Sequence, residues 1–498
     1  MNQSTLLQLD ATRPSVNFGF SAAPLADLLA AIAKLVCEFL STSPTPTATL
    51  DFELQLQSIL REMGRVIMEW TLNRIEPQAA EAAPARVTFD RQTYRRKRTK
   101  SNRPKLATLF GHIHVERLLY EPLERGESSI FPLEINLGVV ARQATPALAE
   151  RAAMHASQET QQALLSILER DHGIHWSVNT LRNVTAEVSQ GMAEQLHATQ
   201  LAQILSWLER AGRSRGKHPV TLAVGRDGIF IPIREEEGYK EAAVATLSVH
   251  DRRGRRLGTV YLGHMPEPLQ ATLSDRLTCL LRDVLRQCQG ALPRLAYITD
   301  AGYHPTEYFE RVLRTMRDPR DVSRRLTWIW VVDFYHASQY VSRLAEHLFG
   351  NGVEGQAWAR KMCKWLKHKP RGVYRVLHSA AYHHAQRSLT KRDEEAYQTA
   401  YQYLLNHQAS MNYADYRARG LPIGSGVTEA ACKTVFTQRF KQSGMSWEIE
   451  SGQTILELRL ARLSQVWTPT YRAYLASRAT LAMPTERGND TIIPQKAA

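Results

Sequence analysis

Cysteine is scarce in this chain of 498 residues. The five cysteines are scattered, odd in number and free of any CxxC pair. This pattern argues against a disulfide framework and against a zinc ribbon, and it fits reduced thiols in the cytoplasm. With 43% hydrophobic and 22% charged residues, the composition is that of a soluble globular protein with an ample core, and the length favours about two to four domains.

Long hydrophobic runs are also missing. The longest apolar stretch, "LADLLAAIAKLVCEFL", is interrupted by Asp27 and Lys34. We therefore expect a buried or amphipathic helix there and no membrane span. The first residues, "MNQSTLLQLDATRPS", lack the basic-then-apolar layout of a secretory signal. No membrane partner is expected.

Acidic residues are outnumbered by basic ones. There are 63 Lys and Arg against 49 Asp and Glu, which gives a net charge of +14 and a pI near 9.6. An excess of this size is typical of a protein with a polyanionic partner, most often nucleic acid and next an acidic membrane surface. The lack of a membrane segment favours nucleic acid. A basic protein with no such partner is the plain alternative.

An N-terminal helical segment is expected over residues 1–85, with helices at 25–40 and 51–75 separated by the Pro/Thr-rich turn "STSPTPTATL". A basic arm with a short β segment is expected over 86–140. Its residues 91–105 hold eight Arg or Lys and no acid. Such a run is either a solvated basic loop or, as we favour, an arm that binds phosphate. The candidate DNA-binding residues of the arm are Arg95, Arg96, Lys97, Arg98 and Lys100.

Residues 141–215 predict a helical domain with the spacing of a helix-turn-helix. In "ETQQALLSILERDHGIHWSVNTLRNVTAEV" a helix is followed by a short turn with Gly173 and by a second helix capped by Ser177 or Asn179. In a helix-turn-helix the second helix enters the major groove of DNA. Plain packing of two helices gives a similar pattern, and that alternative stays open.

From residue 216 the pattern changes to α/β. The stretch "HPVTLAVGRDGIFIPI" predicts a strand, a turn and another strand, and a strand pair follows around "DRRGR". Strands then alternate with helices up to residue 337, which indicates a mixed sheet covered on both faces. An all-α insertion is predicted over 338–421, the last part of the α/β core over 422–470 and a C-terminal tail over 471–498.

Three aspartates are predicted at strand ends. Asp227 ends "VTLAVGRDG", Asp300 ends "LAYITDAG", and Asp333 ends a strand in "WVVDFYHA", with His336 one helical turn further on. Two-metal phosphoryl transfer needs carboxylates that converge at one edge of a rigid sheet. For Asp227 a simple Asp-Gly hairpin turn is the alternative. That alternative is weaker for Asp300, where a buried strand leads into a helix.

Glu429 is the single acid between Arg417 and Trp447, a segment with five Arg or Lys. In "GSGVTEAACKTVF" Ser425 can cap a helix, and the glycines beside it allow a tight approach. Glu429 then falls in the first turn, with Lys433 on the same face, where it could reach a phosphate. The alternative is an exposed Glu–Lys pair worth about 0.2–0.5 kcal/mol. We favour a site, because a surface pair needs no such approach.

These segments share their order with a known family. Asp227, Asp300, "DFYH", a helical insertion and "PIGSGVTEAACKTVFTQRFKQSGMSW" together resemble the DDE transposases of bacterial insertion sequences. The resemblance is to the ISKra type, with Mutator-like elements as more distant relatives, and its most specific part is residues 422–447. It implies a ribonuclease-H-like core with Asp227 on the first strand, Asp300 after the fourth strand and Glu429 on a helix beyond the insertion.

The resemblance also implies a reaction. Asp227, Asp300 and Glu429 would hold two Mg²⁺ ions, with Mn²⁺ as a substitute. Water would first hydrolyse the 3′ ends at the terminal inverted repeats of the element, and the freed 3′-hydroxyls would then attack target DNA. His336 is implied to act near the scissile phosphate, with Asp333 orienting it.

The implied partners are double-stranded DNA of the element ends and of the target. Arg439, Lys441 and Trp447 would hold the element end, with Trp447 stacking on an unpaired base. A homodimer or larger synaptic complex in the bacterial cytoplasm, associated with the nucleoid when bound, is expected. Two alternatives stay open, namely a catalytically silent DNA-binding descendant and a ribonuclease-H-like nuclease that recognises nucleic-acid structure.

Overall fold

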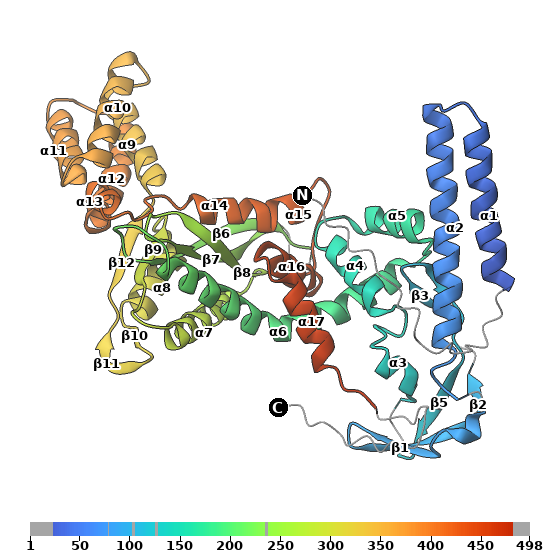
Figure 1. Ribbon diagram of the computed structural model, residues 1–498. Coiled ribbons are helices and arrows are strands. Elements are labelled where there is room, and N and C mark those ends of the chain that lie inside the picture. The colour runs from blue at the N-terminus through green and yellow to red at the C-terminus, as the bar shows by residue number, and fades with distance from the viewer. Residues whose placement is uncertain (1–22, 78, 102–104, 125–127, 235–237, 482–498) are drawn as a thin grey trace. The chain divides into compact units, whose positions relative to one another are not determined.

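A computed structural model describes a mixed α/β chain (Figure 1). The described residues are 23–77, 79–101, 105–124, 128–234 and 238–481. They form two compact units, the first drawn from 1–148, 166–175 and 479–498, and the second from 149–165 and 176–478. None of the described helices is both long enough and apolar enough to cross a bilayer.

The first unit begins with a helical hairpin of α1 (Ala23–Ser41) and α2 (Pro46–Leu72). Both predicted helices are confirmed, but α2 begins earlier than predicted. Thr45 is its N-cap and accepts a hydrogen bond from the Ala48 amide at 3.1 Å. Pro46 follows at the first helical position, where its missing N–H costs nothing. Six of the ten residues of the expected Pro/Thr-rich turn are therefore helix, namely Ser41 and residues 46–50.

The predicted basic arm is largely a strand. A three-stranded antiparallel sheet has the order β1 (Arg86–Phe89), β2 (Gln92–Ser101) and β5 (Arg117–Pro122), and β2 contains most of the basic run. The remaining elements of this region are the hairpin of β3 (Leu106–Thr108) and β4 (Gly111–Ile113), and α3 (Pro132–Asn136).

The predicted helix, turn and helix are present. The elements are α4 (Pro146–Ala156), α5 (Gln161–His172) and α6 (Val178–Gly212). Gly173 has a positive φ of 65°, which glycine adopts readily. Ser177 is the N-cap of α6 and accepts a hydrogen bond from the Thr180 amide at 3.1 Å. The residues of the predicted domain 141–215 are divided between the two compact units.

The second unit is built on a five-stranded mixed sheet with the order β12-β9-β6-β7-β8. Its strands are β6 (Thr221–Pro232), β7 (Tyr239–His250), β8 (Arg256–His264), β9 (Arg294–Thr299) and β12 (Trp328–Val332). The first three form an antiparallel meander, and β9 and β12 run parallel to β6. The predicted mixed sheet is confirmed. A short hairpin of β10 (Arg317–Asp318) and β11 (Asp321–Arg325) was not predicted.

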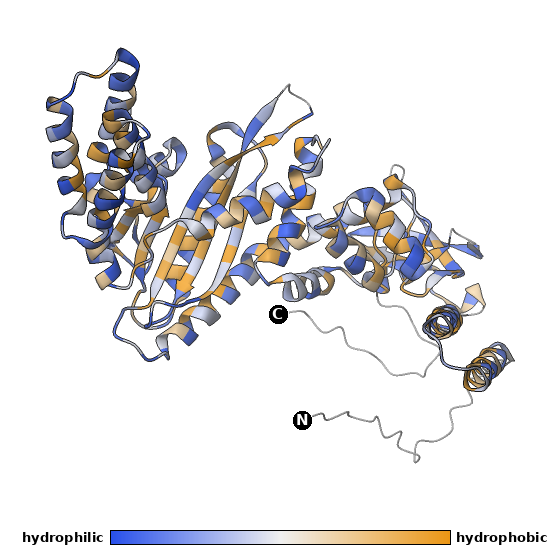
Figure 2. Ribbon diagram, turned by 90° about the horizontal axis from the view of Figure 1, so that it is seen from above, coloured by the Kyte–Doolittle hydropathy of each residue, from blue (hydrophilic) through white to orange (hydrophobic). Residues whose placement is uncertain are grey.

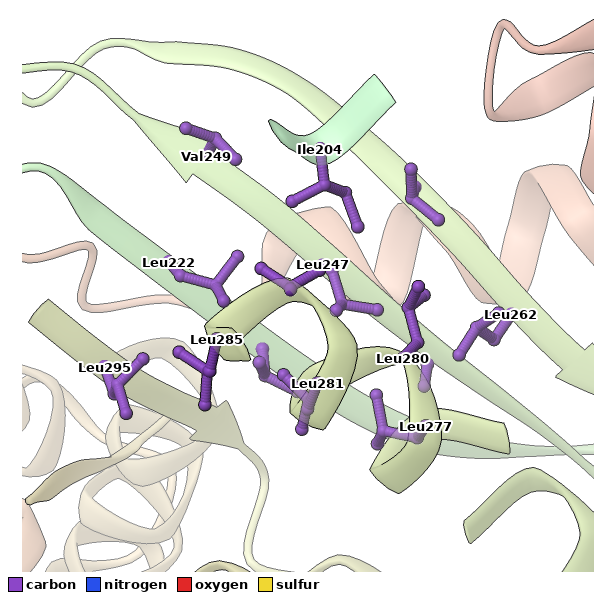
Figure 3. Packing of buried hydrophobic residues seen from close by; sticks show 14 of the residues in the cluster. Ile204, Leu222, Leu247, Val249, Leu262, Leu277, Leu280, Leu281, Leu285 and Leu295 are labelled. Carbon is purple, nitrogen blue, oxygen red and sulfur yellow. The ribbon is translucent and has the colours of Figure 1, made fainter. Parts of the chain in front are cut away.

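One face of this sheet carries a large hydrophobic core. α6 and α7 (Ala271–Gln287) cover it, and α8 (Tyr303–Tyr308) continues as a π-helical turn, Phe309–Leu313, beside them. Figure 3 shows Leu277, Leu281 and Leu285 of α7 packed on the strands. Because side chains alternate between faces along a strand, residues of β6 such as Leu222 enter this core, while Ala223 enters the core on the other face.

The predicted insertion is all-helical. Its helices are α9 (Phe334–Phe349), α10 (Val353–His368), α11 (Gly372–Ala385), α12 (Lys391–Asn406) and α13 (Tyr413–Ala418). They pack around a core of their own, which includes Val341, Met362 and Leu404 and extends to β9 and β12 of the sheet. The insertion is thus anchored on the α/β core (Figure 1).

After the insertion the chain returns to the sheet. α14 (Gly426–Ala431) leads into a π-helical turn, Cys432–Thr437, and α15 (Gln438–Phe440). α16 (Ile449–Leu463) packs on β8 and α6, and α17 (Trp467–Ser477) packs on α6. Most of the predicted C-terminal tail, residues 482–498, lies outside the described residues.

Candidate active site

Asp227 lies inside a continuous strand. Asp227 pairs with Val244 and Gly228 pairs with Ala243, and the ladder of β6 and β7 continues to Pro232. The predicted turn at Asp-Gly is therefore wrong. A Cβ at Gly228 would lie 1.7 Å from Oε1 of Glu241, so a larger residue there would require the flexible Glu241 side chain to move.

Asp227 and Asp300 lie on the same face of the sheet. The parallel register of β6 and β9 ends with Gly225 opposite Ile298. Asp227 is two residues further along β6, and Asp300 is two residues beyond Ile298, directly after the end of β9. A step of two residues along an extended chain returns to the same face. This is the face that carries Ala223 and Ile298, opposite to the core under α7.

The backbone after Asp300 is strained. Ala301 has a positive φ of 63°, which is uncommon for a residue with a Cβ. Asp300 accepts a hydrogen bond from the Gly302 amide at 2.9 Å through its Oδ1, and Ala301 donates to the Thr299 hydroxyl at 3.2 Å. Strain of this kind persists where the surroundings fix it and is concentrated at functional sites.

Glu429 reaches this face because α14 packs closely on the sheet. Thr428, its neighbour, bonds through its hydroxyl to the hydroxyl of Thr246 at 2.9 Å. A Cβ at Gly225 would lie 1.9 Å from that same hydroxyl oxygen of Thr428. The missing side chain at Gly225 is therefore what allows α14 to come so near.

Asp333 is fully buried and fixes the start of α14. Its carboxylate accepts hydrogen bonds from the His336 amide, at 2.6 Å, and from the Ser425 amide. It thus caps α9 and holds the Gly-Ser-Gly segment at once. The prediction that Asp333 orients His336 needs correction in one respect. The bond goes to the backbone of His336, and no bond from Asp333 to the imidazole is found among the described residues.

Ser425 stands at the N-cap position of α14 but makes no capping bond through its side chain. Its hydroxyl donates to Oε1 of Glu429 at 2.7 Å instead. The predicted capping bond is therefore wrong. The hydroxyl is used to hold the carboxylate, since the backbone of Ser425 is already fixed by Asp333.

These side chains share one cavity of about 230 Å³. It is lined by Arg226, Asp227, Asp300, His336, Gln339, Ser425 and Glu429. The structure thus brings together the three predicted metal-binding acids and the predicted helper His336. Asp333 lies behind the cavity and acts on it through Ser425.

Burial and the neighbouring carboxylates perturb the pKa of Asp227. Burial raises the pKa of Asp227 from 3.8 to about 6, and the charges of Asp300 and Glu429 add to the effect. The Cys432 thiol and the Gly228 amide oppose it through hydrogen bonds. Several anionic groups without a cation beside them are costly in a partly buried cavity. A bound cation would relieve this repulsion.

Carboxylate oxygens are the ligands that Mg²⁺ and Mn²⁺ prefer. By charge and donor type, Asp227, Asp300 and Glu429 therefore fit such ions. No group of three or more His, Cys, Asp or Glu side chains in the described part of the chain is gathered closely enough to form a ready coordination shell. Binding would therefore require rotation of these side chains toward a common point.

Cys432 belongs to this site, and the sequence interpretation missed it. Its Sγ lies 3.3 Å from Oδ2 of Asp227. Burial and the neighbouring charge of Asp227 raise the pKa of the thiol, so that it stays a donor. The signal available in the sequence was its spacing, because a residue three after Glu429 lies on the same side of a helix.

A second missed residue is Tyr403, which comes from α12 of the insertion. Its hydroxyl donates to the backbone oxygen of Asp300 at 2.7 Å. Its ring stacks on Tyr340 at 3.7 Å and lies 6.0 Å from the ring of His336. The insertion thus supports the wall of the cavity. The contact between Tyr403 and Asp300 spans 103 positions of sequence, so no local sequence pattern predicts it.

The residues predicted to hold a DNA end differ in exposure. Lys433 and Lys441 are exposed. Arg439 is only 2% exposed, donates to the Ala156 carbonyl and lies over the ring of Trp447. Trp447 donates from Nε1 to the Phe440 carbonyl at 3.1 Å and pairs by its backbone with Ile233. Arg439 and Trp447 thus have structural partners, and the burial of Arg439 does not support its direct contact with DNA, while Trp447 is half-buried.

The predicted arm residues also differ from one another. Arg95 and Arg98 are exposed, and Lys100 is half-buried. Lys97 forms an ion pair with Glu121 at 2.6 Å, and Arg96 donates to the Ala83 carbonyl. Arg95 and Arg98 are therefore the members of the arm best placed to meet a phosphate.

No protein-family model matches this chain, and no curated protein sequence matches it. The cavity, its charges and the basic surfaces of the molecule are therefore the basis on which a function is assigned.

Proposed function

We propose that this protein is a DDE transposase of the bacterial insertion-sequence type, which cuts the ends of its element and joins them to target DNA. One observation carries the proposal. Asp227, Asp300 and Glu429, which are far apart in the sequence, line a single cavity together with His336. They stand on the first strand, after the fourth strand and on a helix beyond the insertion. A ribonuclease-H-like core has the same placement.

The insertion supports a nucleic-acid partner. Residues 355–386 contain seven Lys or Arg and no acid. Two aromatic side chains in this segment, Tyr374 and Tyr382, are 52% and 57% exposed. Basic side chains bind phosphates and exposed aromatic rings stack on bases, so the combination is typical of a nucleic-acid surface.

The N-terminal end of α6 supports sequence recognition. Asn179, Arg182 and Asn183 are exposed there and lie within one turn of each other. Amide and guanidinium groups on the first turns of a helix are suited to reading base edges in the major groove. In the proposed helix-turn-helix, α6 would serve as the recognition helix.

Within this proposal each residue of the cavity has a task. Two Mg²⁺ ions held by Asp227, Asp300 and Glu429 would polarise the scissile phosphate. Ser425 holds the carboxylate of Glu429, and the Cys432 thiol holds that of Asp227. His336 lies at the cavity wall, where its ring can donate to a phosphate oxygen.

Cleavage of DNA tests the proposal. Purified protein with Mg²⁺ should nick DNA at the terminal inverted repeats that flank its own gene and join the ends to a second DNA. Asp227→Asn, Asp300→Asn and Glu429→Gln should abolish both steps and leave DNA binding intact. Asp321→Asn, on the exposed strand β11 and not among the residues that line the cavity, removes the same charge and should leave cleavage unchanged.

Two outcomes would replace the proposal. If the parent protein binds the repeats but cleaves no DNA with Mg²⁺ or Mn²⁺, the chain is a silent DNA-binding descendant. If it cleaves branched or hybrid substrates without regard to the repeats and joins nothing, it is a ribonuclease-H-like nuclease. The three acids on one cavity favour catalysis, and the basic, aromatic insertion favours a transposase over a small nuclease.

A further inference from the structure

Helix α1 is apolar on two adjacent sides. One stripe, made of Leu25, Leu28, Ile32, Leu35 and Phe39, has the spacing of a helix–helix contact and faces α2. It includes the ring of Phe39, which stacks on Phe52 of α2 at 4.5 Å. The sequence predicted a buried or amphipathic helix here. This stripe explains the apolar residues of α1 that face α2, but it does not explain the other apolar residues of the helix.

The second stripe of α1 is exposed. It consists of Ala26, Leu29, Ala33, Val36 and Leu40, and we call it the outer stripe. Its large members are 59% (Leu29), 36% (Val36) and 77% (Leu40) exposed. The steps between its members are three, four, three and four residues, which is the spacing of a coiled-coil contact. In Figure 2, which views the hairpin along its helix axes, hydrophobic residues lie around both helices.

Exposure of this apolar surface to water costs free energy, and the two-helix hairpin by itself does not bury it. Among the side chains of the two helices whose burial is described, only Leu35 and Leu72 are deeply buried. Among the described elements, α2 is the one that packs extensively on α1. Exposed apolar patches of this kind mark contact surfaces. The outer stripe contains no charged residue, so it fits an apolar partner surface, and its spacing suits a second helix.

We propose that the outer stripe packs against the outer stripe of a second copy of this chain, with the two α1 helices antiparallel. An antiparallel pair centred on Ala33 places Leu40 against the partner's Ala26 and Val36 near the partner's Leu29. Large residues then meet small ones or fill the space beside them, as interdigitated packing requires. The stripe is thus complementary to itself, which is the condition for a two-fold interface.

The low net charge of α1 also favours contact with a second copy of the chain at the outer stripe. The whole chain carries +14, so most of its surface repels a second copy. Helix α1 is different, because its charged residues are Asp27, Lys34 and Glu38, a net charge of 1 − 2 = −1. Lys34 and Glu38 are 3.7 Å apart and neutralise each other. The outer stripe is therefore a face on which two such basic chains can approach. This inference does not rest on the proposed catalytic function.

Sedimentation of the full chain without DNA tests the proposal. The parent protein should form a concentration-dependent dimer. Leu29→Glu and Leu40→Glu, which bury a carboxylate in the contact, should weaken it by at least about tenfold. Lys34→Glu, which puts a carboxylate on the exposed polar side of the same helix, should leave the dimer in place. Circular dichroism of each variant checks that the helices are kept.

Disulfide trapping tests the direction of the helices. In a Cys37→Ser background, Ala33→Cys should link two copies, because the two-fold axis passes beside this residue. Ala26→Cys should link them only if the helices are parallel. A parent protein that stays monomeric, a dimer unaffected by Leu29→Glu and Leu40→Glu, or efficient linkage through Ala26→Cys would overturn the proposal. So would binding of α1 to lipid vesicles in place of dimer formation.

Discussion

The thiol of Cys432 lies 3.3 Å from Oδ2 of Asp227, on the side of the carboxylate opposite to the Gly228 amide, which bonds to Oδ1 at 2.8 Å. The two donors together fix the plane of one of the three acids that line the cavity. This contact joins the first strand of the core to the helix that carries Glu429, over 205 positions of sequence. It gives Cys432 the role of a positioning residue in the proposed active site.

Cys432→Ala should lower DNA cleavage about three- to tenfold, because one hydrogen bond to Asp227, worth about 1 kcal/mol, is lost. Cys432→Ser keeps a donor of similar size and should restore most of the activity. Rates of strand cleavage at saturating Mg²⁺ provide the measurement. Cys363→Ala, at a partly buried thiol of the insertion, is the matched control. Equal activity of the Ala and Ser variants would show that Cys432 does not act through hydrogen bonding.

Gly225→Ala should abolish cleavage. The new Cβ would lie 1.9 Å from the Thr428 hydroxyl, so α14 would have to move away from the sheet and take Glu429 with it. Gly263→Ala is a matched control on β8, because a Cβ there meets atoms no nearer than 3.5 Å. Adding Thr428→Ala to Gly225→Ala removes the clashing oxygen and should recover part of the activity. Full activity of the single Gly225→Ala variant would contradict the close approach of α14.

Stability of the metal-free protein should depend on pH through Asp227. Its folded-state pKa of about 6 is above the unfolded value of 3.8, so the folded protein holds this proton more tightly than the unfolded chain does. Stability is therefore lost as pH rises through this range, by at most about 3 kcal/mol. Asp227→Asn should be more stable than the parent at pH 8, with an advantage that grows by about 1.4 kcal/mol between pH 5 and pH 8.

Urea unfolding in the presence of a chelator measures this effect. Asp321→Asn is a control of opposite sign, because hydrogen bonds from Ser323 lower the pKa of Asp321 and its replacement should reduce stability slightly at pH 8. Added Mg²⁺ should reduce the advantage of Asp227→Asn, since a cation relieves the repulsion in the parent. An advantage that does not change with pH would mean that Asp227 titrates normally.

Much of this site follows from sequence and some of it does not. The alternation of strands and helices predicted the mixed sheet, and acids near strand ends predicted that Asp227 and Asp300 would meet. The continuous strand β6 was not predictable, because Asp-Gly is a local turn signal and the partner that overrides it, β7, is supplied by the rest of the fold. A local turn preference is overridden wherever a strand distant in sequence supplies hydrogen bonds to the backbone.

Side-chain roles were harder to predict than elements. A basic residue in a polar run is usually exposed, yet Arg439 is buried against the Ala156 carbonyl and the Trp447 ring. Ser425 had the right position for a helix cap, but its hydroxyl is bonded to Glu429. Both outcomes depend on contacts between segments far apart in sequence or on competition for one hydroxyl, which spacing alone does not reveal.

DNA affinity should depend on salt through two separate basic surfaces. On the insertion, Lys364, Arg371 and Arg375 are exposed in a segment without acids. Each phosphate contact contributes about 0.9 to the slope of log affinity against log salt. Replacing all three residues by Ala should therefore reduce the slope by about 2–3 if each meets a phosphate. Titrations of labelled DNA at several salt concentrations provide the slopes.

The strand β2 is tested in the same way through Arg95→Ala and Arg98→Ala, with an expected reduction of about 2. Arg311→Ala with Arg314→Ala is the matched control, because these arginines pair with Glu307 and Glu310 and are not free for phosphate. The two reductions should add if the surfaces bind different phosphates, since independent contacts release counterions independently. A slope that is unchanged by one set of substitutions but reduced by the other would assign the DNA contact to a single surface. A slope that is unchanged by both sets would show that neither surface contacts DNA phosphates.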